Sequence, residues 1–310
     1  MTTINAPVLH WYTNGNCDVA IFADGSKKRM YQGDPTPEFP ESIDLKITDY
    51  CDAGCRFCHE SSTTRGKHAS AENVMGILEG LPAGVEVAIG GGNPLSHPQL
   101  EALLMLMRGR GLVPNLTVNT KHFKDAVPTL RRWQKKGLLY GVGVSTENAY
   151  DAVFRHSFRL LNPGLADRLT KEPDHLVYHL IAGIASPLPL TSGTDTRILV
   201  LGYKAYGFGR KFDQSAVTEC LHKWRYWLPR ILKKCQSVSF DNLAVRQLHV
   251  RDVVGEDAWK RHYMGDDGQF TMYADAVRME YAPSSTSRRV PANGMSAREF
   301  FPLLAGEDRG

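Results

Sequence analysis

The sequence lacks an apolar run of the roughly 18 residues that are needed to cross a membrane. Its first residues, MTTINAPVLH, include no basic stretch followed by an apolar core, so no secretory signal is expected. These two absences predict a cytoplasmic protein without a membrane partner. In a reducing compartment, the six cysteines among the 310 residues are not expected to form disulfides.

The sequence also lacks an acidic excess, an internal repeat and a long low-complexity linker. Its apolar fraction of 42% and charged fraction of 23% are those of an ordinary globular protein. The net charge of +4 is a mild basic bias, which is compatible with a polyanionic partner but does not require one. A chain of this composition can bury a substantial core without disulfides or structural metals.

Cysteine is scarce outside one short segment. Three of the six crowd into eight residues, while Cys17, Cys220 and Cys235 are far apart and are expected to be buried or incidental thiols. No cysteine follows Cys235, so a cysteine-rich C-terminal region that could hold further metal clusters is missing.

Short β-type runs alternate with helical patterns from Ser42 onward. This alternation predicts parallel strands covered by helices, an α/β fold. Units of this size favour a partial (β/α)6 TIM-like barrel, in which function lies at the C-terminal ends of the strands. The expected strands are Ile43–Thr48, Val85–Ile89, Leu116–Asn119, Gly141–Ser145, Leu176–Ile181, Arg197–Leu201 and Ser237–Phe240. The expected helices are Ala71–Leu81, Pro98–Arg110, Ala126–Lys136, Asp151–Leu161 and Asp213–Lys234.

Two extensions flank this barrel core, which is placed at residues 41–248. Residues 1–40 are expected to form a β-hairpin around Asp24-Gly25, a two-residue turn signal. Residues 249–310 form a C-terminal extension with one further possible strand, Phe270–Ala276.

The cysteine-rich segment reads Cys51-Asp-Ala-Gly-Cys55-Arg-Phe-Cys58 and follows the first expected barrel strand. Thiolates are soft ligands that suit zinc or iron–sulfur clusters. A structural zinc site takes four protein ligands, and His59 or His68 would have to supply the fourth. Three thiolates on a [4Fe-4S] cluster would instead leave one iron open to a substrate or cofactor.

This CX3CX2C segment, placed after the first strand of a βα series, resembles the signature of the radical S-adenosylmethionine (SAM) superfamily. Phe57 matches the aromatic residue that usually precedes the last cysteine. The resemblance implies that Cys51, Cys55 and Cys58 ligate three irons of one [4Fe-4S] cluster, and that SAM binds the fourth. It further implies reductive cleavage of SAM to a 5′-deoxyadenosyl radical that abstracts a hydrogen atom.

Later strand ends resemble the SAM-binding segments of that superfamily. Gly90-Gly91-Gly92-Asn93-Pro94 is similar to its GGEP segment, with Asn93 where the family usually has Glu. An amide oxygen still accepts a hydrogen bond from an ammonium group but carries no charge. The resemblance also implies SAM contacts from four residues on later strands or just after them, namely Asn119, Ser145, Ile181 and Gly183. Asn119 and Ser145 have an alternative role as helix caps.

Substrate residues are expected where the last strands end. The segment Tyr203–Lys211 mixes glycines with aromatic and basic residues, a composition able to bind an anion or stack on a base. Tyr203, Lys204 and Arg210 are candidates from it, and Asp241 is a candidate from the next strand end. A solvent-exposed loop is the alternative.

The sequence thus predicts a radical SAM enzyme whose substrate is a nucleotide or nucleic-acid base. A peptide or amino acid is the alternative substrate, and an activase for a glycyl radical enzyme is a third possibility. The resemblance implies an external one-electron donor of the flavodoxin or ferredoxin type. Outside this class, the alternative is a non-catalytic, zinc-stabilised binding protein.

Overall fold

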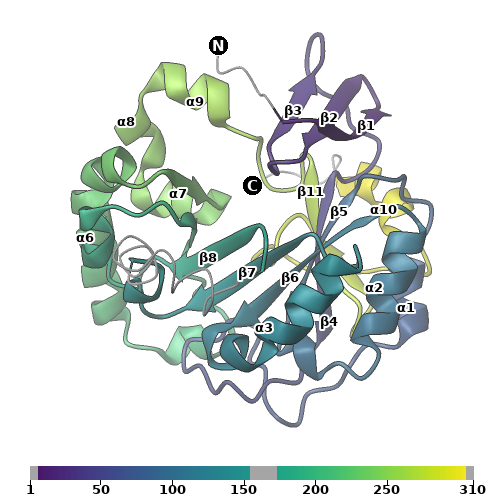
Figure 1. The fold of residues 1–310 in the computed structure, drawn as a ribbon, viewed down its shortest axis with the longest axis horizontal. Coiled ribbons are helices and arrows are strands. Elements are labelled where there is room, and N and C mark those ends of the chain that lie inside the picture. Colours follow the sequence, from purple (N-terminus) through teal and green to yellow (C-terminus); the bar gives the residue numbers. More distant parts are fainter. Residues whose placement is uncertain (1–5, 154–172, 305–310) are drawn as a thin grey trace.

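The structure is a computed structural model that describes residues 6–153 and 173–304. A ten-stranded sheet runs through it in the order β10-β9-β8-β7-β6-β5-β4-β11-β12-β13 (Figure 1). Strands β4 to β10 pair in parallel with their neighbours, and β11 pairs in parallel with β4. These strands are β4 Ser42–Thr48, β5 Glu86–Gly91, β6 Val113–Asn119, β7 Gly141–Thr146, β8 Leu176–Ile181, β9 Arg197–Leu201, β10 Ser237–Phe240 and β11 Thr271–Asp275.

This arrangement confirms the expected partial TIM-like barrel with a small antiparallel sheet at the N-terminus. The sheet continues past the expected core, because β11 from the C-terminal extension covers the free edge of β4. The antiparallel strands β12 (Glu280–Ala282) and β13 (Val290–Pro291) extend it further.

Amphipathic helices cover the outer face of the sheet. In α2, Leu100, Leu103, Leu104 and Met107 are buried on one side, a spacing that places them on one face of the helix. The long helix α6 buries Val217, Trp224, Leu228 and Ile231 in the same way. The helices are α1 Ala71–Ile77, α2 Leu100–Gly109, α3 Thr120–Lys135, α6 Gln214–Lys234, α7 Asn242–Leu248, α8 Val250–Val254, α9 Glu256–His262 and α10 Ala297–Leu304.

The expected helix Asp151–Leu161 falls mostly in residues 154–172, which lie outside the described part of the chain. The expected helix Ala126–Lys136 begins earlier, at Thr120, because Asn119 caps it by accepting a hydrogen bond from the Lys121 amide. No helix in the described ranges is long and apolar enough to cross a membrane.

The N-terminal extension is a three-stranded antiparallel sheet in the order β1-β2-β3. The expected hairpin is present as β2 (Cys17–Phe22) and β3 (Lys27–Met30), and β1 (Val8–Asn14) was not anticipated. Ion pairs fasten this sheet to the barrel: Lys27 lies 2.7 Å from Glu86 and 3.5 Å from Glu41, and Arg29 lies 2.7 Å from Glu41.

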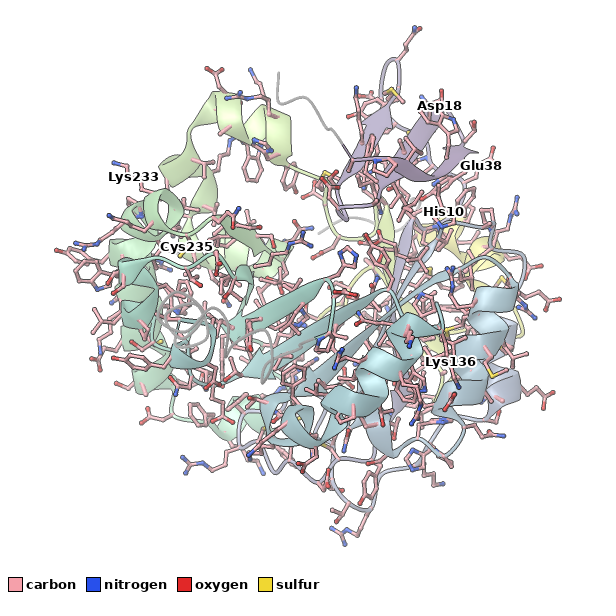
Figure 2. All side chains as sticks on the ribbon, in the orientation of Figure 1. His10, Asp18, Glu38, Lys136, Lys233 and Cys235 are labelled. Carbon is pink, nitrogen blue, oxygen red and sulfur yellow. The ribbon has the colours of Figure 1, made fainter. Side chains whose placement is uncertain are left out.

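The three scattered cysteines lie far from one another. Asp18, the neighbour of Cys17, is on the N-terminal sheet, while Cys235 lies across the molecule at the end of α6 (Figure 2). The Cys220 and Cys235 thiols contact the carbonyls of Ala185 and Leu190. All six cysteines of the chain are free.

Candidate active site

The cysteine loop leaves the C-terminal end of β4 and returns to the barrel before α1. Its backbone is held by bonds from the Cys51 amide to the Thr63 carbonyl and from the Cys58 amide to the Cys55 carbonyl. Gly54 has φ of +68°, a conformation that glycine adopts without strain. This turn keeps Cys51, Cys55 and Cys58 in one loop, each of them partly exposed.

Burial raises the pKa of the Cys51 thiol, and it raises the pKa of Cys55 to about 11. Negative charges nearby also raise these two pKa values, from Cys58 and Asp52 for Cys51 and from Glu147 and the neighbouring thiolates for Cys55. Nearby donors oppose this effect: the Asn119 side-chain amide lies 3.6 Å from the Cys55 sulfur, and Lys121 is bonded to the Ala53 carbonyl. Thiolates packed this closely are stabilised together by a shared cationic metal centre.

In residues 6–153 and 173–304, no three His, Cys, Asp or Glu side chains converge on one metal ion. A [4Fe-4S] cluster makes a different demand, because each thiolate binds its own iron. The two histidines considered as zinc ligands have other contacts. His68 bonds through Nδ1 to the Thr48 hydroxyl at 2.8 Å, and the His59 ring lies 3.4 Å from Glu60. The three thiols fit a cluster.

The glycine loop at the end of β5 lies directly against the cysteine loop. The Gly92 amide donates to the Thr48 carbonyl at 2.7 Å, and the Asn93 amide donates to the Tyr50 carbonyl at 2.6 Å. A Cβ atom on Gly92 would lie 2.1 Å from the Tyr50 oxygen, so only glycine permits this approach. The two segments that the resemblance assigns to cluster and SAM are therefore adjacent.

The Asn93 side chain is buried and fully engaged within the protein. Its oxygen accepts from the Leu95 amide at 3.2 Å, and its nitrogen donates to Asp52 at 3.1 Å and to Ser96 at 3.0 Å. Asp52 also contacts His122 of α3 at 2.9 Å. A carboxylate from the cysteine loop thus lies beside the position where the family usually has Glu.

The other residues expected to contact SAM lie at the same edge of the sheet. Asn119 and Ser145 are paired across β6 and β7, and Ser145 is paired with His179 across β7 and β8. Gly183 follows β8 with φ of +100°. Asn119 caps α3, which is the alternative role considered for it, and its side-chain amide also lies 3.6 Å from the Cys55 sulfur.

The loop after β9 packs onto the cysteine loop. The Phe208 amide donates to the Cys58 carbonyl at 2.9 Å, and a Cβ atom on Gly207 would lie 2.5 Å from the His59 carbonyl. Phe57 packs edge-on against Phe212 with 5.9 Å between ring centroids. The loop therefore holds the last cysteine in place.

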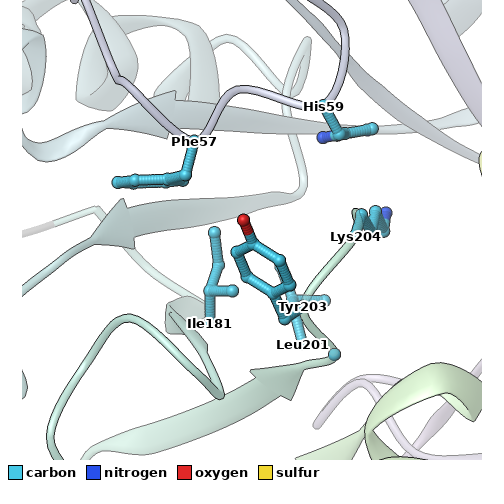
Figure 3. Close-up of a pocket in the computed structure, with 7 residues that line it drawn as sticks. Phe57, His59, Ile181, Leu201, Tyr203 and Lys204 are labelled. Atoms are coloured by element: carbon cyan, nitrogen blue, oxygen red, sulfur yellow. The ribbon is translucent and has the colours of Figure 1, made fainter. Parts of the chain in front are cut away.

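A cavity of about 50 Å³ lies between these two loops (Figure 3). Phe57 and His59 line one side of it, and Tyr203 and Lys204 reach it from the opposite side (Figure 3). Burial and the charge of Lys204 lower the pKa of His59 to about 3. The ring is therefore neutral at pH 7.

The four expected substrate residues occupy different environments. The Tyr203 hydroxyl is buried and donates to the Gly209 carbonyl at 2.6 Å. Lys204 donates to the Ser285 hydroxyl at 2.7 Å, and Arg210 lies exposed near the Tyr206 ring. Asp241 caps α7 and accepts from the Gly202 and Ala244 amides. Lys204 is the member of this set that lines the cavity with a charged group.

Sequence reasoning missed a buried charge network beside the cysteine loop. Lys46 of β4 is ion-paired with Asp49, Glu60 and Asp275 at 2.5, 2.7 and 3.1 Å. Arg289 binds Glu60 at 2.7 Å and Asp275 at 2.9 Å. Burial raises the pKa of Glu60, but the charges of Lys46 and Arg289 outweigh burial and bring the pKa down to about 2. The net effect keeps Glu60 ionised.

A signal for this network is present in the sequence of β4. Apolar Ile43, Leu45 and Ile47 alternate with polar residues, and the apolar set is buried under the helices. The polar set, Asp44, Lys46 and Thr48, must then face the barrel interior. The Asp44 side chain is exposed on this interior face, so water reaches the lumen of the partial barrel there.

Parallel strands, a three-cysteine loop after the first of them and a glycine loop after the second define a domain built to hold an iron–sulfur cluster beside SAM. Residues 45–159 match the family model described as the Radical SAM superfamily. The chain thus carries a radical SAM domain and is a radical SAM enzyme, and the cofactors of such a domain are a [4Fe-4S] cluster and SAM. A comparison with curated proteins gives no match.

Solved structures with the same fold include SuiB from Streptococcus suis. It shares 13% identity with this chain at a TM-score of 0.55, over 98% of this chain and 90% of that chain. SuiB bound to the precursor peptide SuiA gives 14% identity and a TM-score of 0.53, over 88% and 67%. SuiB bound to S-adenosylmethionine gives 13% and 0.50, over 87% and 68%. At these identities the likeness shows the fold alone.

Different segments of the site would bind the cluster, bind SAM and exclude water. When bound, the reduced cluster and SAM supply one-electron bond cleavage and hydrogen-atom abstraction. Cys51, Cys55 and Cys58 would hold the cluster, and the glycine loop would present backbone groups to SAM. The packing of the β9 loop on Cys58 shields that side of the cysteine loop from water, which limits side reactions.

Proposed function

We propose that this radical SAM enzyme acts on a peptide. The observation that supports it best is the charge of the lumen, where Asp44 faces water with Asp241 and Asp267 nearby. Carboxylates in an enclosed site repel a phosphate group and attract an amine. SuiB, which has a similar fold, has been solved with a precursor peptide.

A nucleotide substrate remains the second candidate, and one feature favours it. Tyr206 and Phe208 are exposed on the β9 loop beside Arg210 and Lys211, so aromatic and basic side chains are available to a base and its phosphate. Tyr203, by contrast, has its hydroxyl bonded within the loop and its side chain buried, so its ring does not face solvent.

We also propose a cytoplasmic location and an external donor of the flavodoxin or ferredoxin type. Free cysteines support a reducing compartment. Arg56, Lys121 and Arg210 are exposed on the cysteine loop, on α3 and on the β9 loop, where they would attract an acidic partner. Reduction of the cluster by such a donor should slow as salt is raised.

The test measures 5′-deoxyadenosine released by the reconstituted, reduced enzyme in the presence of SAM. Separate reactions receive a library of short peptides, a set of nucleosides, and oligonucleotides. Stimulation by peptides alone supports the proposal, and stimulation by nucleosides or oligonucleotides alone overturns it. Cys55→Ala is the control that should abolish release in every reaction.

A further inference from the structure

Asp44 occupies the middle of β4 on the face that points into the barrel. Its neighbours in register are Ala88 of β5 and Tyr273 of β11, so a short side chain flanks it on one side. On the same face, Lys46 has three carboxylate partners. In the part of the chain that the structure describes, Asp44 has neither a hydrogen bond nor an ion pair.

The Asp44 side chain lies on the interior face of the barrel, where water reaches it. Although the side chain is exposed to water within the lumen, the surrounding protein raises the pKa of its carboxyl by disfavouring the charged form. A carboxylate that is accessible and has no protein partner in the described residues can pair with a positively charged ligand.

The charges around Asp44 favour a cation over an anion. The cation that acts on it from the described residues is Lys204, but the Lys204 ammonium donates to the Ser285 hydroxyl instead of pairing with Asp44. Asp241 and Asp267 add two further carboxylates, and Arg246 pairs with Asp267 at 3.5 Å, so these charges together with Asp44 stay negative in sum. Lys204 also acts on His59 next to the last cysteine, so the surroundings of Asp44 adjoin the cavity by the cysteine loop.

We propose that Asp44 binds a primary amine or guanidinium group of the substrate, such as the end of a lysine or arginine side chain. This inference rests on the proposed function, whose substrate class it narrows to peptides with a basic residue. Asp44 lies four residues before the end of β4, about 13 Å along the strand. It is therefore an anchor for the substrate, held away from the strand ends where the cofactors bind.

A substitution can distinguish a role of Asp44 in ligand binding from a role in folding. Asp44→Asn keeps the shape of the side chain and removes only the charge. Because no protein partner is lost, the free energy of unfolding should stay the same or rise slightly. A variant that binds less and unfolds at the same denaturant concentration has lost a recognition group.

The experiment titrates the reconstituted enzyme, with SAM present, with two small probes followed by ligand-observed NMR. One probe is Nα-acetyl-lysinamide, and the other is its Nε-acetylated, neutral analogue. The wild type should bind the cationic probe at least tenfold more tightly than the neutral one. In Asp44→Asn the two affinities should agree within twofold. Glu79→Gln, which removes an exposed carboxylate just after α1, should leave the preference unchanged.

Equal affinities for the two probes in the wild type would overturn the inference, and so would a preference that survives in Asp44→Asn. Neither result depends on the natural substrate being a peptide, because the probes are single residues. If the preference depends on Asp44 while only nucleosides stimulate SAM cleavage, the cation site stands and the proposed peptide substrate fails. If peptides stimulate cleavage without any charge preference, the reverse holds.

Discussion

The residue that departs most from the superfamily pattern, Asn93, is held by a partner that the pattern does not include. Its amide nitrogen binds Asp52, a residue of the cysteine loop, at 3.1 Å. A carboxylate of the cysteine loop is therefore bonded to the residue that stands where the family usually has Glu.

The contact between Asn93 and Asp52 predicts that a carboxylate at position 93 would be repelled by Asp52. Removing the Asp52 charge should relieve that repulsion. Asn93→Asp would bring a second carboxylate next to Asp52 and would lose the donor to Ser96, so it should lower the free energy of unfolding by about 1–3 kcal/mol. Adding Asp52→Asn to the same chain should recover more than half of that loss. Urea unfolding of the wild type, both single variants and the double variant measures the coupling, and strictly additive effects would contradict it.

His179 makes stability depend on pH. Burial lowers its pKa to about 4, below the ordinary 6.5, and its ring lies where a Cβ atom on Gly143 would be 2.4 Å away. The unfolded chain therefore takes up a proton first as pH falls. The stabilisation from this residue is complete above pH 6.5 and decreases as pH falls toward 4.

Between pH 7.5 and pH 5, this effect should cost about 2 kcal/mol of the free energy of unfolding. His179→Gln does not titrate, so its stability should fall less over the same range. Urea unfolding at both pH values gives the comparison. An identical decrease in wild type and variant would assign the pH dependence to other groups.

At the scale of elements, the segment between β12 and β13 contacts the cysteine loop, although the two are far apart in sequence. Arg289 joins Glu60, two residues after Cys58, to Asp275 at the end of β11. Arg289→Met would leave these carboxylates with one buried cation, Lys46, and should cost about 2–4 kcal/mol. The iron content retained after gel filtration should also fall.

The matched control is Arg288→Met, which removes the same charge from an adjacent, exposed position. It should change neither denaturant midpoint nor iron content. Arg289→Lys should restore part of the stability, since an ammonium group can pair with one of the two carboxylates but not hold both. Equal losses for the two methionine variants would mean that net charge, and not this contact, is responsible.

The elements themselves could largely be predicted from the sequence. Strands β8, β9 and β10 have the bounds that apolar patterning gave, because short buried parallel strands stand out between polar loops. The pairing of β11 with β4 could not be predicted, since nothing local in Thr271–Asp275 specifies its partner. The strand β1 was missed because its burial alternates with several exposed apolar residues.

The parts of the site that are contiguous in sequence could be predicted. The cysteine and glycine loops are each contiguous in sequence, so their neighbourhood follows from the order of the strands. The engagement of Asp241 with two backbone amides is tertiary, as is the network around Lys46. A charged residue in a strand shows that it has a partner but does not identify it.

Within residues 6–153 and 173–304, a continuous hydrophobic core includes residues from both extensions. Residues 249–310 were expected to be an extension, and they supply β11 as well as Asp275 and Arg289. A chain ending at Leu248 should therefore lose cooperative unfolding and fail to retain iron. Circular dichroism during urea unfolding and an iron assay test this, and a truncated chain with a cooperative transition and full iron content would contradict it.

The pairing of β4 with β11 also sets an order of events during synthesis. More than 200 residues separate the two strands, so the ribosome needs roughly 10–40 s between them at 5–20 residues per second. Throughout this interval the nascent chain displays three reactive thiols and an unpaired strand edge that invites aggregation. Delivery of iron and sulfide is thus expected to follow release of the finished chain, and a chaperone that covers the β4 edge would protect both until then.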